Sequence, residues 1–284
     1  MATQITKKKI NGTKDLAEAI RIFFNLNLEE RLCILTDESM EGDSATAYNQ
    51  LGLNARRETY KKIASDFKIR ADYKENNGKR NIILDVGCGS GLLSLKLAEQ
   101  TSGIIIGVDT SKDMIFLARQ NKKRRAEEIS DLVQYNPWFI EGSVYDLPVL
   151  VEPVDYIVCR NVLHRLRKPE KAIEQMLKVL KVEGKMYLRD LKRDADWRTI
   201  VERIGKERWA NPTLVKDYIA AMASTLTIGE IKEILRDKGI QNYIISNGSY
   251  KNGNEPLSKD NLREFEKETE YVCVIEKPKP KYKP

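Results

Sequence analysis

The residues of this sequence best suited to chemistry are three glycines at alternate positions, Gly87, Gly89 and Gly91, within NIILDVGCGSGLLSLKLAEQ. An apolar run precedes them and a helical pattern follows, and a strand, a glycine-rich turn and a helix hold a small charged molecule against bare backbone. A dinucleotide site needs a third small residue at the position of Leu92, so the spacing departs from that pattern. Asp85, just before the turn, would repel a pyrophosphate but can accept a hydrogen bond from an ammonium group. The turn therefore predicts a cofactor with an amino-acid end and no phosphates.

The elements that must position this turn alternate between strands and helices. Short β-rich runs predict strands at 82–86, 103–109, 138–142, 154–160 and 184–191. Helical patterns separate them at 90–100, after Ser111, which is a candidate helix cap, and at 169–181. Apolar strands that alternate with amphipathic helices predict an α/β fold, in which helices cover both faces of a parallel sheet.

The two ends of the chain are expected to add further elements. Towards the C-terminus we predict helices at 195–205, 212–222 and 227–239, the last with a capping box from Thr227 to Glu230, and strands at 240–246 and 270–277. Helical spacing also runs from Asp15 to about Arg70, and a polar break follows at 73–80. We therefore divide the chain into an N-terminal helical region, 1–75, a main domain, 76–277, and a flexible Lys/Pro tail, 278–284.

The composition favours a folded protein in a reducing compartment. The chain has 284 residues, of which 41% are hydrophobic, and no apolar run approaches the roughly 18 residues of a membrane span. We expect no signal peptide, no membrane anchor and a cytoplasmic location. The four cysteines are far apart and form no CxxC pair, which argues against disulfides and a zinc site. The net charge of +7 is spread along the chain, so nucleic acid is not favoured as a partner.

The segment ILDVGCGSGLLSLKLAEQTSGIIIGVDTSKDMIFLARQN closely resembles the cofactor-binding half of class I S-adenosylmethionine-dependent methyltransferases. The resemblance continues through EGSVYDLP, through VDYIVCRNVLHRLRKPEKAIEQMLKVLKVEGKMYLRD and into the last two strands, and covers roughly 81–277. It implies a doubly wound, Rossmann-like sheet of seven mostly parallel strands with the last one antiparallel. To this fold we add the N-terminal helical region and a helical lid insertion.

The resemblance also implies a role for individual residues. Asp85 and the backbone from Gly87 to Gly89 would hold the methionine end of S-adenosylmethionine, Gly91 would allow close helix packing, and Asp109 would bind both ribose hydroxyls. Thr110 and Met114 would flank the ribose and the adenine. Ser143 stands where the family usually has an aspartate that contacts the adenine amino group, and a hydroxyl can accept the same bond without charge assistance. Cys88, Val144 and Arg160 complete the predicted cofactor site, and no metal is expected.

The reacting end follows the strand at 154–160. His164 is the only histidine of the chain and lies where related small-molecule methyltransferases often have LHH or LHxL. An imidazole can remove a proton from a hydroxyl or amine acceptor, but many such enzymes rely on alignment alone, so His164 either acts as a base or lines the pocket. Arg160 could also bind an acidic acceptor or bond to the backbone. Cys159 lacks the flanking residues of covalent cytosine methylation, and we interpret it as a buried strand residue.

Acceptor choice is expected to depend on residues outside these motifs. Candidate lid residues are Tyr48 and Tyr60 in the N-terminal helices and Trp197, Trp209, Tyr218 and Met222 in the inserted helices, although aromatics at helical spacing are more often ordinary core. CRNV stands where amino-methyltransferases of nucleic acids carry N/D-P-P-Y/F, which argues against an RNA or DNA acceptor. The sequence predicts methyl transfer to an unidentified small molecule. The alternatives are a protein or RNA acceptor, or a non-catalytic regulator that binds S-adenosylmethionine.

Overall fold

The computed structural model of the chain describes residues 31, 39–54, 56–75, 78–128, 136–147, 152–195, 212–247 and 269–279. The helices predicted near 15–35 and at 195–205, and the tail from 280 onward, lie outside these residues.

Within the described part of the chain, seven strands form one sheet in the order β3-β2-β1-β4-β5-β7-β6. The strands are β1 (Ile82–Val86), β2 (Ile104–Asp109), β3 (Trp138–Glu141), β4 (Val154–Arg160), β5 (Leu180–Leu191), β6 (Tyr243–Asn247) and β7 (Glu270–Glu276). The pairs from β3 to β5 are parallel, and β7 runs antiparallel to both of its neighbours, β5 and β6. The predicted mostly parallel sheet with an antiparallel last strand is confirmed.

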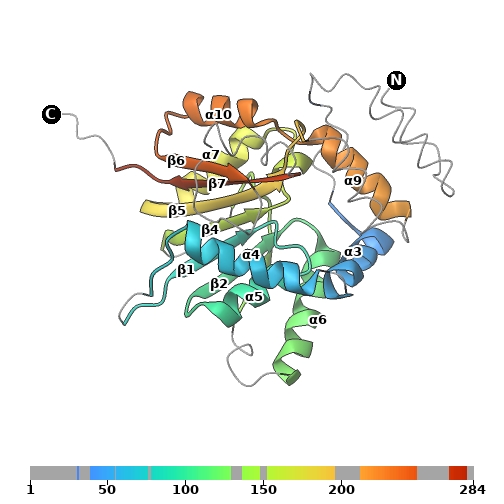
Figure 1. The fold of residues 1–284 in the computed structure, drawn as a ribbon. Helices are drawn as coiled ribbons and strands as arrows, with labels where there is room; N and C mark the ends of the chain where they lie inside the picture. The colour runs from blue at the N-terminus through green and yellow to red at the C-terminus, as the bar shows by residue number, and fades with distance from the viewer. Residues whose placement is uncertain are drawn as a thin grey trace.

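Helices cover both faces of this sheet, as Figure 1 shows. The helices are α3 (Gly42–Asn54), α4 (Arg57–Arg70), α5 (Leu92–Gln100), α6 (Lys112–Glu128), α7 (Pro169–Val179), α9 (Pro212–Ser224) and α10 (Ile228–Asp237), with a 3₁₀ turn, η2, at Leu163–Arg165. On one face, Phe67 of α4 and Leu97 of α5 pack against Ile83 and Val158 of the sheet. On the other face, α7 and α10 bury apolar residues against the opposite side of β1, β4 and β5. The doubly wound architecture follows from this burial on both faces.

Several element boundaries differ from the predicted ones, among them the starts of α5, β5 and β6, and the first two have a clear local cause. Helix α5 begins at Leu92 and not at Ser90, because Gly91 has a left-handed φ of 74° and serves as its N-cap. Strand β5 begins at Leu180, four residues earlier than expected, because Leu180 already pairs with Val154 before the register shifts. In contrast, the capping box from Thr227 to the side chain and backbone of Glu230 forms as predicted.

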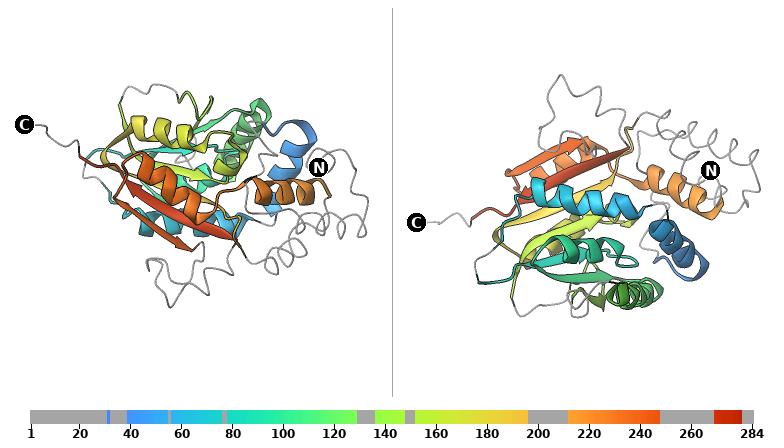
Figure 2. Two further views of the ribbon diagram at one scale, coloured as in Figure 1. Left: turned by 90° about the horizontal axis from the view of Figure 1, so that it is seen from above. Right: turned by 60° about the horizontal axis from the view of Figure 1, so that its bottom comes forward.

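Helices α3 and α9 lie side by side at the end of the molecule to which the parallel strands point, as both views of Figure 2 show. The apolar side of α4 belongs to the core of the sheet, and its first turn reaches the same end. Strand ends and three helices therefore surround one region, which is where open α/β sheets bind ligands. Of the helices built from described residues, none has the length and apolarity that crossing a bilayer requires.

Candidate active site

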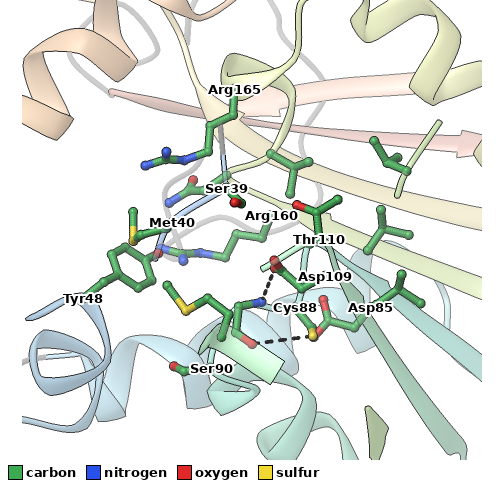
Figure 3. A pocket seen from close by; sticks show the side chains of 18 of the residues that line it. Ser39, Met40, Tyr48, Asp85, Cys88, Ser90, Asp109, Thr110, Arg160 and Arg165 are labelled. Atoms are coloured by element: carbon green, nitrogen blue, oxygen red, sulfur yellow. Dashed lines mark hydrogen bonds between the residues drawn. The ribbon is translucent and has the colours of Figure 1, made fainter. Parts of the chain in front are cut away.

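A pocket of about 210 Å³ lies at the carboxyl ends of β1, β2 and β4 (Figure 3). The predicted site residues that line it are Asp85, Gly87, Cys88, Gly89, Asp109, Thr110, Met114, Ser143, Val144, Arg160 and His164. Gly91 alone among the predicted residues is not part of the lining. The sheet brings these residues together because the ends of parallel neighbouring strands meet at one edge.

The three glycines of the turn meet different surroundings. All three have positive φ, 69° for Gly87, 53° for Gly89 and 74° for Gly91, a backbone conformation that favours glycine. A Cβ on Gly91 would lie 2.5 Å from a ring carbon of Phe139, so this glycine allows α5 to pack closely on β3. A Cβ on Gly89 would meet nothing nearer than the sulfur of Met114 at 3.9 Å. Gly89 therefore leaves open space on the floor of the pocket.

Asp109, at the end of β2, is tied to the turn and to the next helix. One carboxylate oxygen accepts the N–H of Gly89 at 2.8 Å, and the other accepts the N–H of Ser111 at 2.9 Å. Burial raises the pKa of Asp109, and these two backbone bonds oppose the rise. Each oxygen keeps lone pairs beyond the one that it uses, so the carboxylate can still accept two hydroxyl donors such as those of a ribose. Ser111 caps α6 by accepting the N–H of Met114 at 3.0 Å, as the sequence predicts.

Asp85, at the carboxyl end of β1, is almost fully buried beside the turn. Ser94 of α5 donates its hydroxyl to this carboxyl at 2.5 Å. Burial raises the pKa of Asp85 to about 7, with a further increase from the nearby charge of Asp109. A cation bound next to Asp85 would favour its ionised form, which suits an ammonium group in the pocket.

The lining of the pocket also includes apolar side chains and one hydroxyl. Met114 and Val144 are buried, whereas Thr110 is exposed. Ser143 accepts the N–H of Tyr145 at 3.1 Å, so its hydroxyl is held in the β3–β4 connection. Apolar side chains and a fixed hydroxyl suit a flat heteroaromatic ring such as adenine.

His164 pairs with a residue that the sequence analysis missed. Its Nδ1 lies 2.6 Å from Oδ1 of Asp190, and both side chains are buried. Asp190 also accepts the N–H groups of Leu163 at 2.8 Å and of Leu191 at 2.7 Å, which hold its carboxylate in place. A carboxylate that only accepts hydrogen bonds keeps the proton on Nδ1 and leaves the Nε2 lone pair available. Among the described residues, none forms a hydrogen bond with Nε2.

Other groups in or near the pocket are less suited to remove a proton. Burial, followed by the neighbouring Tyr48, raises the pKa of Tyr60 to about 12, so this phenol stays neutral. Burial also raises the pKa of the Cys88 and Cys159 thiols, so neither is a ready thiolate nucleophile. Cys159 is a buried residue of β4, in agreement with the interpretation from the sequence.

The helices outside the sheet contribute a second part of the lining. Ser39 and Met40 before α3, Tyr48 of α3, Tyr60 of α4, and Asp217, Tyr218 and Ala221 of α9 all line the pocket. Arg165, next to His164, forms an ion pair with Asp217 at 2.6 Å and ties η2 to α9. Of the other candidate lid residues, Met222 is buried away from the pocket, and Trp197 and Trp209 lie outside the described residues.

Of the missed residues Asp190, Ser94 and Asp217, the first two had a usable signal in the sequence. Asp190 lies at the carboxyl end of the predicted strand at 184–191, and His164 follows the carboxyl end of the strand at 154–160. If these two strands are neighbours in the sheet, a contact between Asp190 and His164 can be expected. Ser94 lies one helical turn after the glycines. Asp217 carries no comparable signal, because its approach to Arg165 depends on how α9 folds back over the sheet.

Comparison with known proteins shows the family of the chain. The methyltransferase domain family matches residues 77–271, and the chain belongs to this family. It is 26% identical over 156 residues to the methyltransferase YcgJ of Bacillus subtilis, covering 55% of each chain. It is 32% identical over 112 residues to a ubiquinone biosynthesis O-methyltransferase of Coxiella burnetii, covering 39% of this chain and 44% of that protein. The chain thus spans about half the length of the curated relatives that it matches.

Among solved structures, the plantazolicin methyltransferase BpumL, in complex with a desmethylplantazolicin analogue and S-adenosylhomocysteine (SAH), shares the fold with a TM-score of 0.60. The identity is 17%, over 94% of this chain and 97% of that chain. The predicted class I methyltransferase family, its fold and S-adenosylmethionine as cofactor are confirmed.

The residues of the pocket fit this cofactor by their own geometry. The open floor at Gly89 provides space beside the backbone, and a side chain at this position would fill it. Asp109 has acceptor capacity left for a ribose, and the buried apolar side chains of Met114 and Val144 in the lining suit an adenine. In the part of the chain that the structure describes, no cluster of histidine, cysteine and carboxylate side chains could hold a metal ion.

Proposed function

We propose that the protein transfers a methyl group from S-adenosylmethionine to a hydroxyl or amine group of a small-molecule acceptor, with His164 as the general base. The pairing of His164 with Asp190 is the observation that carries this proposal. S-adenosylmethionine, when bound, supplies the methyl group on a positively charged sulfonium. The chain has to hold the cofactor, align the acceptor and accept its proton.

The cofactor side of the proposal uses the predicted residues. Asp109 would bind the ribose hydroxyls, Met114 and Val144 would enclose the adenine, and Ser143 would accept a bond from its amino group. Gly87 and Gly89 keep the backbone bare where the cofactor lies against it. These roles are proposals that rest on the position of each residue in the pocket.

The acceptor side depends on Nε2 of His164. Because Asp190 holds the proton on Nδ1, Nε2 can accept a proton from a hydroxyl or an amine as the acceptor lone pair becomes a nucleophile. The positive charge that develops on the imidazole would be stabilised by Asp190, whose carboxylate lies 2.6 Å away. An acceptor atom without a proton would gain nothing from this pair. The geometry therefore favours an O–H or N–H acceptor.

A small molecule is favoured because helices α3, α4 and α9 overhang the reacting end. Tyr48, Tyr60 and Tyr218 come from these three helices and line the same pocket as His164. An acceptor group that reaches His164 shares the pocket with these three side chains, which suits a compact molecule better than a folded protein or an RNA helix.

Incubation of the protein with methyl-labelled S-adenosylmethionine and a cell extract tests the proposal. We expect the label to pass a small-pore filter without prior digestion, and to do so equally after nuclease or protease treatment. Label that stays with protein or with RNA would instead indicate a macromolecular acceptor. Cofactor binding without label in any fraction would indicate a regulator and refute the enzymatic proposal.

Once this experiment has isolated the acceptor, variants of His164 test its role as the general base. His164→Gln should lower kcat on the order of 10²- to 10⁴-fold while SAH binding stays unchanged. An unchanged kcat would show that His164 only lines the pocket.

A further inference from the structure

A second pocket, of about 100 Å³, lies among helices α3, α4, α5 and α6. Figure 1 shows these four helices next to one another, and each of them contacts two of the others, so that they surround the pocket as a ring. None of the predicted cofactor residues lines this second pocket, and neither does His164. The second pocket is therefore separate from the site described above.

The interior of the second pocket is largely apolar. Leu53 of α3, the ring of Tyr60 of α4, and Leu92 and Leu95 of α5 line it. A Cβ on Gly52 would lie 2.5 Å from Cδ1 of Leu92, so this glycine lets the end of α3 lie close to α5. A hollow with such a lining favours a ligand whose apolar body replaces the water in it.

The lining of the second pocket also carries an excess of positive charge, with four cations and two carboxylates. The two carboxylates already have partners. Glu99 pairs with Lys96 at 2.6 Å and with Arg125 at 2.7 Å, and Arg125 also pairs with Glu128 at 2.7 Å. These three ion pairs form one chain across α5 and α6.

The remaining cations of the lining are Arg57 of α4 and Arg124 of α6. Both are exposed, and neither forms an ion pair with a described residue. They act on Glu128 only through space, because Arg125 holds that carboxylate. A guanidinium binds a carboxylate through two parallel hydrogen bonds. An apolar interior beside two such cations matches a small amphipathic carboxylate.

The second pocket shares a wall with the active site. Tyr60 and Leu92 line both pockets. Asn121, in the lining of the second pocket, donates its amide to the carbonyl of Ser90 at 2.9 Å and to Oδ1 of Asn49 at 2.8 Å. Ser90 belongs to the glycine turn and lines the active site, whereas Asn49 belongs to α3. A ligand in the second pocket therefore contacts residues that hold the glycine turn and α3 in place.

We propose that the second pocket is an effector site for a small amphipathic carboxylate. The apolar body lies against Leu53, Leu92 and Leu95, and the carboxylate lies between Arg57 and Arg124. The bound ligand stabilises the shared wall and so tightens cofactor binding, and by linkage the cofactor tightens the binding of the ligand equally. This site goes beyond the proposed function, and only its coupling to the cofactor depends on the active site.

Octanoate is a suitable probe, with octanol as its neutral and octylamine as its cationic counterpart of equal chain length. Equilibrium dialysis on the full chain, saturated with SAH, measures the affinity for each probe while the cofactor site is filled. We expect one octanoate per chain, bound on the order of 3- to 10-fold more tightly than octanol, and octylamine bound most weakly. Equal affinity for the three probes, or no binding, would overturn the proposal.

Variants of the two arginines test the contact with the carboxylate. Arg57→Met and Arg124→Met keep an apolar stem and remove a cation, so each should weaken octanoate about 2- to 3-fold and leave octanol unchanged. The double variant should bind the two probes equally. Lys123→Met is the matched control, since Lys123 is exposed beside Arg124 but does not line the pocket. A double variant that still prefers octanoate would contradict the proposed contact.

Arg160→Met tests whether octanoate enters the active site instead. Arg160 lines the active-site pocket and not the second one, so this variant should bind octanoate as wild type does. Weaker octanoate binding in Arg160→Met together with unchanged binding in Arg124→Met would place the ligand in the active site and overturn the proposal.

Calorimetry with SAH, with and without saturating octanoate, measures the coupling. Octanoate should tighten SAH on the order of 5-fold. Asn121→Leu removes the bond to Ser90, so it should abolish this coupling and keep the preference for octanoate over octanol. SAH affinity that octanoate leaves unchanged in wild type would show that the pocket is no effector site. If the protein binds no SAH, the proposed function fails, and dialysis without SAH still decides whether the second pocket binds the carboxylate.

Discussion

Nδ1 of His164 and Oδ1 of Asp190 lie 2.6 Å apart between the ends of two parallel strands, β4 and β5. The pair joins the turn after one strand to the last residues of the next, and both side chains are buried. A buried imidazole that lines a pocket and has one nitrogen fixed by a carboxylate has a defined tautomer, which is what a general base requires.

Asp190→Asn should therefore lower the rate of methyl transfer without affecting cofactor binding. An amide can donate to Nδ1 and stabilise the wrong tautomer, so we expect kcat to fall on the order of 10²- to 10⁴-fold. The measurement is kcat with the isolated acceptor, together with calorimetric SAH affinity. Asp217→Asn is the control, because it removes a carboxylate of the same pocket that does not touch His164. Full activity of Asp190→Asn would rule out the proposed base.

The contribution of Asp85 to the stability of the ligand-free protein should fall as pH rises from about 4 to 7. The pKa of Asp85 is raised to about 7 by burial, so the folded state binds the proton more tightly than the unfolded chain does. This contribution is fully present below the unfolded pKa and is lost as pH rises through the folded one, with an upper limit of roughly 4 kcal/mol.

Asp85→Asn removes this titration, so its free energy of unfolding should vary less between pH 4 and 8 than that of wild type. Urea unfolding at several pH values measures the difference. Parallel pH profiles for the two proteins would show that Asp85 titrates normally in the folded state.

Gly91→Ala should mainly lower the stability of the protein, whereas Gly89→Ala should mainly weaken SAH binding. Gly91→Ala adds a Cβ 2.5 Å from Phe139 and 2.9 Å from Ala118, so it should cost about 1–3 kcal/mol of stability more than Gly89→Ala. Both variants share the cost of a left-handed backbone, which the comparison removes. Gly89→Ala should weaken SAH binding more, because its Cβ would occupy the pocket floor. Urea unfolding and calorimetry on both variants decide this, and an equal loss of stability would contradict the packing role of Gly91.

Arg31 should stabilise the position of the turn that carries His164 relative to α9. Its guanidinium donates to the carbonyls of Leu163 at 3.2 Å, Leu166 at 2.6 Å and Ser224 at 2.5 Å, and so ties both ends of the turn that carries His164 to the end of α9. Arg31→Met should destabilise the protein by about 1–3 kcal/mol and raise KM for the acceptor, with SAH affinity unchanged. Lys123→Met, on α6, serves as the control. A loss of SAH affinity in Arg31→Met would place its effect on the cofactor side.

The sequence by itself determined the family, the alternation of strands and helices and most of the cofactor site. These follow from short-range features: the spacing of Gly87, Gly89 and Gly91, the aspartates at two strand ends, and apolar runs that only a sheet covered on both faces can bury. Local conformation still moved two boundaries, since the left-handed Gly91 delays α5 and the pairing of Leu180 advances β5. The division of the chain at 75/76 stays a prediction.

The tertiary structure decided which side chains meet. His164 and Asp190 come together because β4 and β5 are neighbours in the strand order, and periodicity carries no information on that order. The same holds for Arg31 against η2, and for the contrast between Arg189, which finds Glu270, and Arg160, which finds no anion among the described residues. Whether a buried charge is paired depends on what other strands and helices place beside it. For that reason the sequence could identify the cofactor, but only the fold shows which charged side chains lie beside one another in the pocket.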